Sequence, residues 1–327
     1  MDYAPLIPFA FAPAFLLGGC RFVPPADARA AVHRHPPPDD PVLARAVAMM
    51  DEGDAVGLRG LLGEHPALVR QRVRGGHDWY TEGYFKNATL LHFVAINPCF
   101  EGERLPANLV EMARVILDAG AEVDAGCGEN GEGTTLGLVV SGMRARTNGL
   151  QEPLIRLLVE RGATMGRAID AALGQNEPGA ARLLVELGTE KTLPDHAAFG
   201  EVREVQRVLA GRGATIETKR RALERAARYG HAAVVSRLCS VDGAGLDPGG
   251  FNPEAPGYDG RCTPLHLAAY HGHLETARVL VRCGANHKVR DTMWNGTPRD
   301  WAKHGGHGEV AAWLDGLTNR ETQEGAR

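Results

Sequence analysis

The stretch that decides the fold runs from residue 262 to 285 and reads CTPLHLAAYHGHLETARVLVRCGA. Thr263 is a residue type that caps the N-terminus of a helix, and Pro264 suits the first helical position, where no amide hydrogen bond is lost. Apolar residues then recur at helical spacing, and Gly272 and Gly284 can each adopt the positive φ that ends a helix. The stretch therefore predicts a short helix, a tight turn and a second helix.

The same unit recurs along the chain. Thr297-Pro298 repeats Thr263-Pro264 downstream. Clear upstream copies are found at residues 223–231, 169–188, 134–163 and 89–121. Two weaker copies are found at residues 193–213 and 46–62. We count about eight units, and neighbouring units must stack to bury their apolar faces in one continuous core. The glycines predicted to end helices are Gly53, Gly120, Gly162, Gly188, Gly213, Gly230, Gly272, Gly284 and Gly306.

The repeating unit resembles the ankyrin-repeat family. The family's T-P-L-H-x-A signature and its Gly-His turn are present at Thr263, Pro264, Leu265, His266, Ala268, Gly272 and His273. The interval from Thr263 to Thr297 is close to the family's period of about 33 residues. The resemblance implies an all-α ankyrin-repeat solenoid of stacked helix-turn-helix units with loop or hairpin insertions, which serves as a binding module for protein partners and carries no catalysis of its own.

The repeats place the domain boundaries. We expect residues 42–317 to form the repeat domain and residues 318–327 to form a disordered tail. Residues 1–41 are expected to be a disordered, proline-rich segment. Leu17 to Cys20 resembles a bacterial lipoprotein cleavage box, but the basic region of a signal peptide is missing before it. We therefore expect a cytoplasmic protein, with a lipoprotein anchored at Cys20 as the alternative.

Insertions break the period at residues 75–87, 97–106, 144–152 and 242–257. Insertions in a solenoid map to loops along one edge, which is often the binding edge. The first insertion gathers four aromatic residues in a chain that is only 6% aromatic, namely Trp79, Tyr80, Tyr84 and Phe85. Exposed aromatic residues are typical of binding hot spots. Alternatively these side chains cap the weak first repeat, and both interpretations remain open.

The family resemblance also implies a concave face made of loop tips and first helices. Its variable positions correspond here to Arg228, Tyr229, Asp259, Arg261, Tyr270, His271, Met293, Trp294, Asn295, Lys303 and His304. We predict that this face and the aromatic insertion bind an unidentified protein partner and that the chain is a monomer. The competing hypothesis is a small-ligand or enzymatic pocket formed by residues 75–87 and 97–106, whose polar groups would be His77, Asp78, Tyr80, Glu82 and Tyr84.

Other classes of function lack their usual sequence patterns. The net charge of −4 and the absence of a Lys/Arg run argue against nucleic-acid binding. The 13 His and 6 Cys show neither C-x-x-C nor H-E-x-x-H spacing, so we predict no metal, no cofactor and no catalytic residue. The scattered cysteines indicate reduced thiols, with Cys127 exposed in a glycine-rich hairpin tip. No stretch reaches the roughly 18 apolar residues of a membrane span.

Overall fold

The computed structural model describes residues 38–74, 85–95, 105–166, 168–211, 213–240, 262–292 and 294–324. The described residues divide into two compact units between Glu190 and Lys191, and each unit is presented by itself. Both units are helical, and within the described ranges the one extended pairing is an isolated antiparallel bridge between Cys127 and Gly133. The predicted all-α repeat fold is confirmed.

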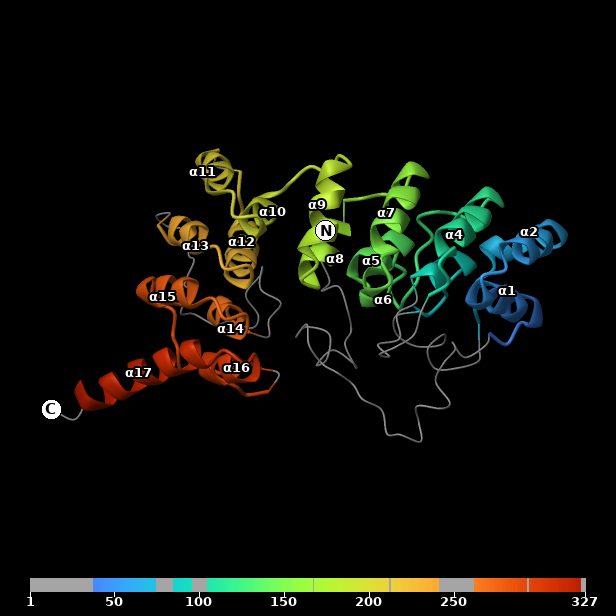
Figure 1. Ribbon diagram of the computed structural model, residues 1–327. Coiled ribbons are helices and arrows are strands. Elements are labelled where there is room, and N and C mark those ends of the chain that lie inside the picture. The colour runs from blue at the N-terminus through green and yellow to red at the C-terminus, as the bar shows by residue number, and fades with distance from the viewer. Residues whose placement is uncertain are drawn as a thin grey trace, which may run out of the picture. The chain divides into compact units, whose positions relative to one another are not determined.

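The unit that ends at Glu190 stacks its helices in two layers (Figure 1). One layer consists of α1 (Pro41–Glu52), the 3-10 helix η3 (Leu90–Val94), α5 (Thr135–Ser141) and α8 (Ala168–Gly174). The other consists of α2 (Ala55–Glu64), α4 (Leu109–Asp118), α7 (Gln151–Glu160) and α9 (Pro178–Glu186). Two short helices, η1 (Pro66–Arg70) and α6 (Met143–Thr147), complete the described part of this unit.

The unit that begins at Lys191 has the same two-layer plan and is coloured yellow to red in Figure 1. Its first-helix layer consists of α10 (Leu193–Ala198), α12 (Ile216–Arg228), α14 (Pro264–Tyr270) and α16 (Pro298–His304). Its second-helix layer consists of α11 (Val202–Ala210), α13 (Ala232–Cys239), α15 (Leu274–Arg282) and α17 (Gly308–Glu324). Each helix packs against the next helix of its own layer, as stacked repeats require.

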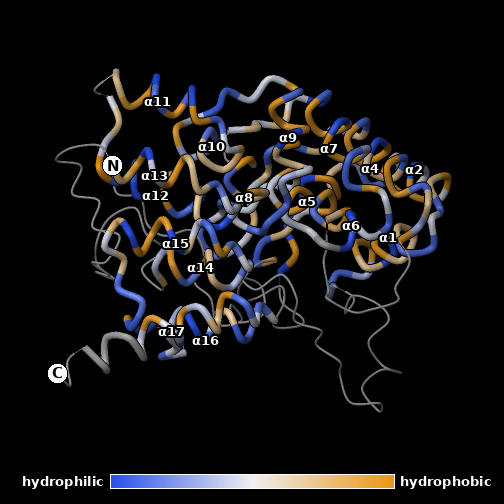
Figure 2. The backbone as a smooth tube through the Cα atoms, turned by 60° about the vertical axis from the view of Figure 1, so that its left-hand side comes forward, coloured by the Kyte–Doolittle hydropathy of each residue, from blue (hydrophilic) through white to orange (hydrophobic). Residues whose placement is uncertain are grey.

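The core of this second unit is built from small and branched aliphatic residues. Ala226 and Ala268 are fully buried where α12 and α14 pack together, and alanine allows this close approach because it has no side chain beyond Cβ. Leu223, Val235 and Leu280 are buried in the same cluster. Figure 2 shows hydrophobic and hydrophilic turns alternating along α11, which buries one face in this cluster through Val205. Burial of such faces is the main force that holds stacked repeats together.

The predicted helix signals are found where the sequence places them. The Thr263 hydroxyl accepts a hydrogen bond from the His266 amide, and the His266 ring accepts one from the Thr263 amide. Every glycine predicted to end a helix has positive φ except Gly213. The prediction for Gly213 was wrong, because α11 ends earlier with Gly211 as its C-cap at φ −76°, and the left-handed glycine of that repeat is Gly200, at φ 72°.

Three local predictions differ from the structure. α17 continues to Glu324, beyond the expected end of the repeat domain at residue 317, and Leu317 packs against the same cluster as Leu314. The insertion at residues 144–152 is not a plain loop, because α6 occupies much of it and α7 begins at Gln151. The first helix expected in residues 89–95 is a single stretch of 3-10 helix, although its Thr89–His92 cap is formed.

Candidate protein-binding surface

The loop between α15 and α16 has a fixed shape because a buried carboxylate organises it. Asp291 accepts hydrogen bonds from the backbone amides of Trp294 and Gly296, both at 2.7 Å. It also accepts one from the indole N–H of Trp301, at 2.9 Å. The Arg290 guanidinium donates to the Asn295 carbonyl at 2.5 Å, across a turn in which Asn295 has a φ of 55°. We call residues 286–297 the Trp294 loop.

The Trp294 loop is also joined to the preceding repeat through His266. The Nδ1 atom of His266 accepts from the Thr263 amide at 3.2 Å, so the ring proton resides on Nε2. Nε2 lies 3.1 Å from the Gly296 carbonyl and donates to it. Burial lowers the pKa of His266 to about 4, which keeps the ring neutral and able to make both bonds near pH 7.

A row of aromatic rings leads from the loop onto α14 and α16. Trp294 is 41% exposed, and its ring centroid lies 5.2 Å from that of Trp301, which is only 5% exposed. Tyr270 follows at 6.0 Å from Trp301, and His304 at 6.3 Å from Tyr270. We call Trp294, Trp301, Tyr270 and His304 the aromatic row. Its two exposed ends, Trp294 on the loop and His304 at the end of α16, are connected through the buried Trp301 and the partly buried Tyr270.

The predicted partner-binding residues differ in their exposure. Trp294, Asn295, Lys303 and His304 are exposed. Tyr229, Tyr270 and His271 are partly buried, and burial together with the charge of Arg228 lowers the pKa of His271 to about 3. Six predicted residues lie outside the described ranges, namely Trp79, Tyr80, Tyr84, Asp259, Arg261 and Met293.

Two predicted partner-binding residues are buried. Arg228 is only 4% exposed, and its guanidinium lies 3.8 Å from the Glu224 carboxylate within the same helix. Phe85 is buried as well, which fits the capping interpretation for that one residue. The sequence position of Arg228 matches that of exposed residues in other repeats, but its neighbours cover it here. Neither side chain is available to a partner in this structure.

The prediction that Cys127 is exposed was wrong. Its side chain is 1% exposed, because the bridge to Gly133 turns it inward: the Cys127 amide donates to the Gly133 carbonyl at 2.8 Å, and the Gly133 amide donates back at 3.0 Å. A Cβ on Gly133 would lie 3.1 Å from the Cys127 sulfur, so the glycine makes this packing possible. Burial raises the pKa of the Cys127 thiol to about 12, which leaves it unreactive as a nucleophile.

The first repeat of the second unit contains an ionic cluster that the sequence did not predict. Glu201 accepts a hydrogen bond from the His196 ring at 2.6 Å and a charged one from Lys191. Burial opposes ionisation, but these two bonds outweigh it and lower the pKa of Glu201. In the next two repeats the corresponding residue is a histidine, His231 or His273, which follows the turn glycine. The glutamate in place of this histidine was the sequence signal that could have revealed the cluster.

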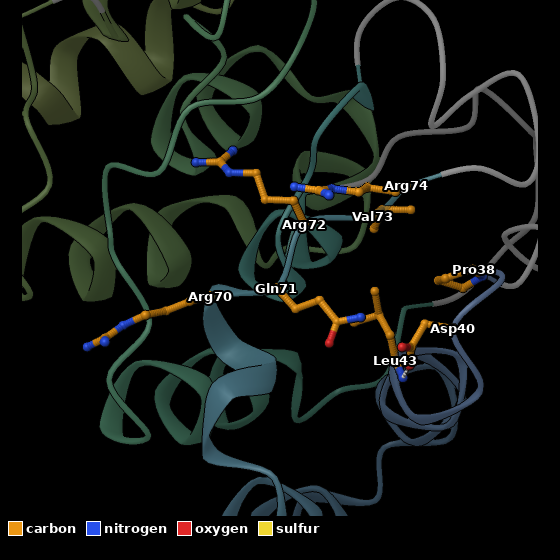
Figure 3. A pocket seen from close by; sticks show the side chains of 8 residues that line it. All are labelled: Pro38, Asp40, Leu43, Arg70, Gln71, Arg72, Val73 and Arg74. Atoms are coloured by element: carbon orange, nitrogen blue, oxygen red, sulfur yellow. Dashed lines mark hydrogen bonds between the residues drawn. The ribbon is translucent and has the colours of Figure 1, made fainter.

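A pocket of about 490 Å³ lies in the first unit, between the start of α1 and the extended segment that follows η1 (Figure 3). Asp40 and Leu43 line one side and residues 70–74 the other, and Pro38 completes the lining. Figure 3 shows Gln71 reaching toward Asp40, while the Arg70, Arg72 and Arg74 side chains leave the segment on the opposite side.

Two of the charged groups that line this pocket, Asp40 and Arg72, are engaged in holding the fold. Asp40 accepts from the amides of Val42 and Leu43 at 2.9 Å and caps α1. Arg72 donates to the carbonyls of Asn87 and Gly126. The polar groups that the pocket hypothesis named, His77, Asp78, Tyr80, Glu82 and Tyr84, all lie outside the described residues. The hypothesis therefore stays a prediction.

Across the described residues, no three His, Cys, Asp or Glu side chains gather as a metal site would require. Within the same ranges, no helix combines the length and the hydrophobicity needed to cross a membrane.

Comparison with known proteins now gives the repeats their family. A family model described as ankyrin repeats (3 copies) matches residues 196–291. The chain is also similar to the human cyclin-dependent kinase 4 inhibitor B, with 47% identity over 51 residues. That match covers 16% of this chain, and it spans only 36% of the length of the curated relative. Ankyrin repeats are generally protein–protein interaction modules. This chain therefore contains ankyrin repeats across residues 196–291.

Proposed function

We propose that the chain binds a protein partner through the surface formed by the Trp294 loop and the C-terminal ends of α14 and α16. The observation that carries the proposal is the 41% exposure of Trp294 on a loop that the buried Asp291 holds in place. Tryptophan is enriched among the residues that dominate binding energy at interfaces. A loop already fixed in shape loses little conformational entropy when a partner binds, which favours affinity.

The proposed surface follows the predicted concave face with one change. It includes Tyr270, His271, Asn295 and His304 around Trp294, with Tyr229 at its edge. Arg228 is left out because it is buried. Two groups of predicted residues remain part of the proposal on sequence grounds alone. They are Trp79, Tyr80 and Tyr84 of the aromatic insertion, and Asp259, Arg261 and Met293 of the predicted concave face.

The curated relative supports the class of partner. Its name describes it as an inhibitor of a kinase, so it acts on another protein. We extend to this chain only that class, a protein bound non-covalently with no catalytic step and no cofactor. We also propose that the chain is a monomer. We propose the cytoplasm as its compartment because the six cysteines are scattered with no C-x-x-C pair.

Affinity capture with matched variants tests the proposal. The full chain serves as bait in extracts of its own cells, and quantitative mass spectrometry compares wild type with Trp294→Ala and Tyr270→Ala. Val56→Ala is the control, because Val56 is 79% exposed but lies on α2 in the other unit. We expect at least one protein whose recovery falls about tenfold with either variant and stays unchanged with the control. Equal recovery of every captured protein by all four baits would overturn the proposal.

A further inference from the structure

We infer that the partner segment bound at the Trp294 surface is acidic, with carboxylate side chains placed beside one aromatic or aliphatic side chain. The inference rests on the proposed function and adds the chemistry of the partner to it.

Exposed basic side chains lie on two elements of the proposed surface. Arg290 is exposed on the Trp294 loop, and its guanidinium bonds to the carbonyl of Asn295, the residue next to Trp294. Lys303 and His304 are exposed at the C-terminal end of α16, and the His304 ring ends the aromatic row. Within the described residues Lys303 and His304 make no ion pair. The Trp294 loop and the C-terminal end of α16 therefore each present an exposed positive charge, that of Arg290 and that of Lys303.

The nearby carboxylates are already engaged in holding the structure. Asp291 is buried and accepts three N–H groups. Asp300 caps α16, since it accepts from the Thr297 amide at 3.0 Å, and this bond holds the pKa of Asp300 below its ordinary value. Asp315 pairs with Arg299 at 2.5 Å. Asp300 lies near enough to Arg290 for the two charges to interact, whereas Lys303 pairs with no carboxylate among the described residues. The positive charge of this surface is therefore only partly offset, and a partner's carboxylates can bind there.

The corresponding loop of the first unit does not share this positive charge. That loop contains Gly133, whose carbonyl lies 3.3 Å from the Nε2 of His92. The carbonyl of Gly296 lies in the same way 3.1 Å from the Nε2 of His266. Its exposed tip carries Glu129 and Glu132 and no basic residue. Two loops with the same anchoring thus present opposite charges, which indicates that the charge serves recognition rather than folding.

A basic surface with aromatic rings also resembles the sites that bind single-stranded nucleic acid. Such sites stack successive bases on several exposed rings. In this row only Trp294 is exposed as a large ring, since Trp301 is 5% exposed and Tyr270 is partly buried. One exposed ring beside separated cations fits a single apolar side chain flanked by carboxylates better than a run of stacked bases.

Selection from a random peptide library displayed on phage tests the inference with the full chain as target. We expect the enriched peptides to be rich in Asp and Glu around one Phe, Trp or Leu. A synthetic peptide with an enriched sequence should lose about tenfold in affinity with Trp294→Ala and about tenfold with Arg290→Glu/Lys303→Glu. Its affinity should also fall steeply as salt is raised.

The control reverses the same amount of charge elsewhere in the same unit. Arg203→Glu/Arg237→Glu alters two exposed residues of α11 and α13, in the second-helix layer, and should leave peptide affinity unchanged. Circular dichroism of each variant checks that its helices are retained.

The other outcomes distinguish failure of the acidic-partner inference from failure of the proposed function. The enriched peptides could instead be neutral or basic, with an affinity that falls with Trp294→Ala but not with Arg290→Glu/Lys303→Glu. This result would overturn the inference of an acidic partner and leave the proposed function standing. Recovery of no peptide sensitive to Trp294→Ala would overturn both. Tight binding of an oligothymidine strand that is lost on the Arg290/Lys303 reversal would assign the surface to nucleic acid and overturn the inference.

Discussion

The Nε2 atom of His273 lies 2.9 Å from the carbonyl oxygen of Arg228, one repeat earlier in the chain. His231 makes the same contact with Ala198 at 2.8 Å. Because a carbonyl only accepts hydrogen bonds, each of these rings donates from Nε2. The same rings lie against left-handed glycines of the preceding repeat: a Cβ on Gly230 would lie 2.6 Å from the Nδ1 of His273. The Gly-His turns thus join one repeat to the next.

Replacing Gly230 with alanine should destabilise the second unit through two effects. Its φ of 79° strains any residue with a Cβ, and the new methyl group would collide with the His273 ring. Backbone strain alone should lower the free energy of unfolding by about 1 kcal/mol, and the collision should increase this loss to about 2–3 kcal/mol. Urea unfolding followed by circular dichroism measures the change.

Gly306 provides the matched control for Gly230. Its φ is 79° as well, but a Cβ there would meet nothing within 4 Å. Gly306→Ala should therefore cost only the strain, about 1 kcal/mol. Equal losses for both variants would show that the His273 ring does not restrict the turn.

Stability should fall as the pH drops from about 6.5 toward 4. Burial lowers the pKa of His266 to about 4, against the opposing effect of the Asp291 and Asp300 carboxylates, and burial lowers that of His92 to about 4. In this window the unfolded chain binds protons that the folded chain does not, so the contribution of each neutral ring is fully present above pH 6.5 and is lost toward pH 4. The expected slope is roughly 1.4 kcal/mol per pH unit for each histidine.

Urea unfolding at a series of pH values checks this dependence. His266→Gln removes one titrating group, so its stability should change less steeply with pH than that of wild type, whatever its stability at pH 7. A slope that is the same for both proteins would contradict the assignment of the low pKa to His266.

Asp291 should hold the Trp294 loop in its observed shape. Asp291→Ala leaves the amides of Trp294 and Gly296 and the indole N–H of Trp301 without their acceptor, so a loss of about 2–4 kcal/mol is expected. Hydrogen–deuterium exchange should then accelerate across residues 286–297. Asp315→Asn is the control, because its exposed pair with Arg299 should be worth less than about 1 kcal/mol. Unchanged exchange in Asp291→Ala would refute this role.

Cys127 should resist alkylation in the folded protein. Its thiol is buried and its pKa is raised to about 12, so the reactive thiolate is almost absent near pH 8. Iodoacetamide followed by peptide mass mapping should find Cys127 unmodified in the native state and modified in urea. Reaction of native Cys127 at the rate of a small free thiol would contradict the buried position.

The sequence predicted those features that depend on local chemistry. Thr263, Pro264 and Gly272 act within a few residues of themselves, so the helix start and stop that they encode could be recognised without a structure. The role of Asp291 depends on Trp301, which lies on the following helix, and nothing in the local pattern signals that contact.

Exposure was the harder property to predict. Arg228 and Tyr270 both stand near the end of a first helix, yet one is buried and the other borders the proposed surface. The repeat register gives the position of a residue on its helix, whereas its exposure depends on the side chains that neighbouring repeats place around it. Residues 144–152 show the same limit, because a helix as short as α6 leaves almost no periodic signal.

The affinity of a captured partner for Trp294→Ala tests the central claim most directly. Isothermal titration calorimetry would compare wild type, Trp294→Ala and the exposed control Val56→Ala against the same purified partner. The account predicts a loss of at least 2 kcal/mol, roughly thirtyfold in Kd, for Trp294→Ala and no change for the control. A Trp294→Ala affinity equal to that of wild type would contradict the claim that this surface binds the partner.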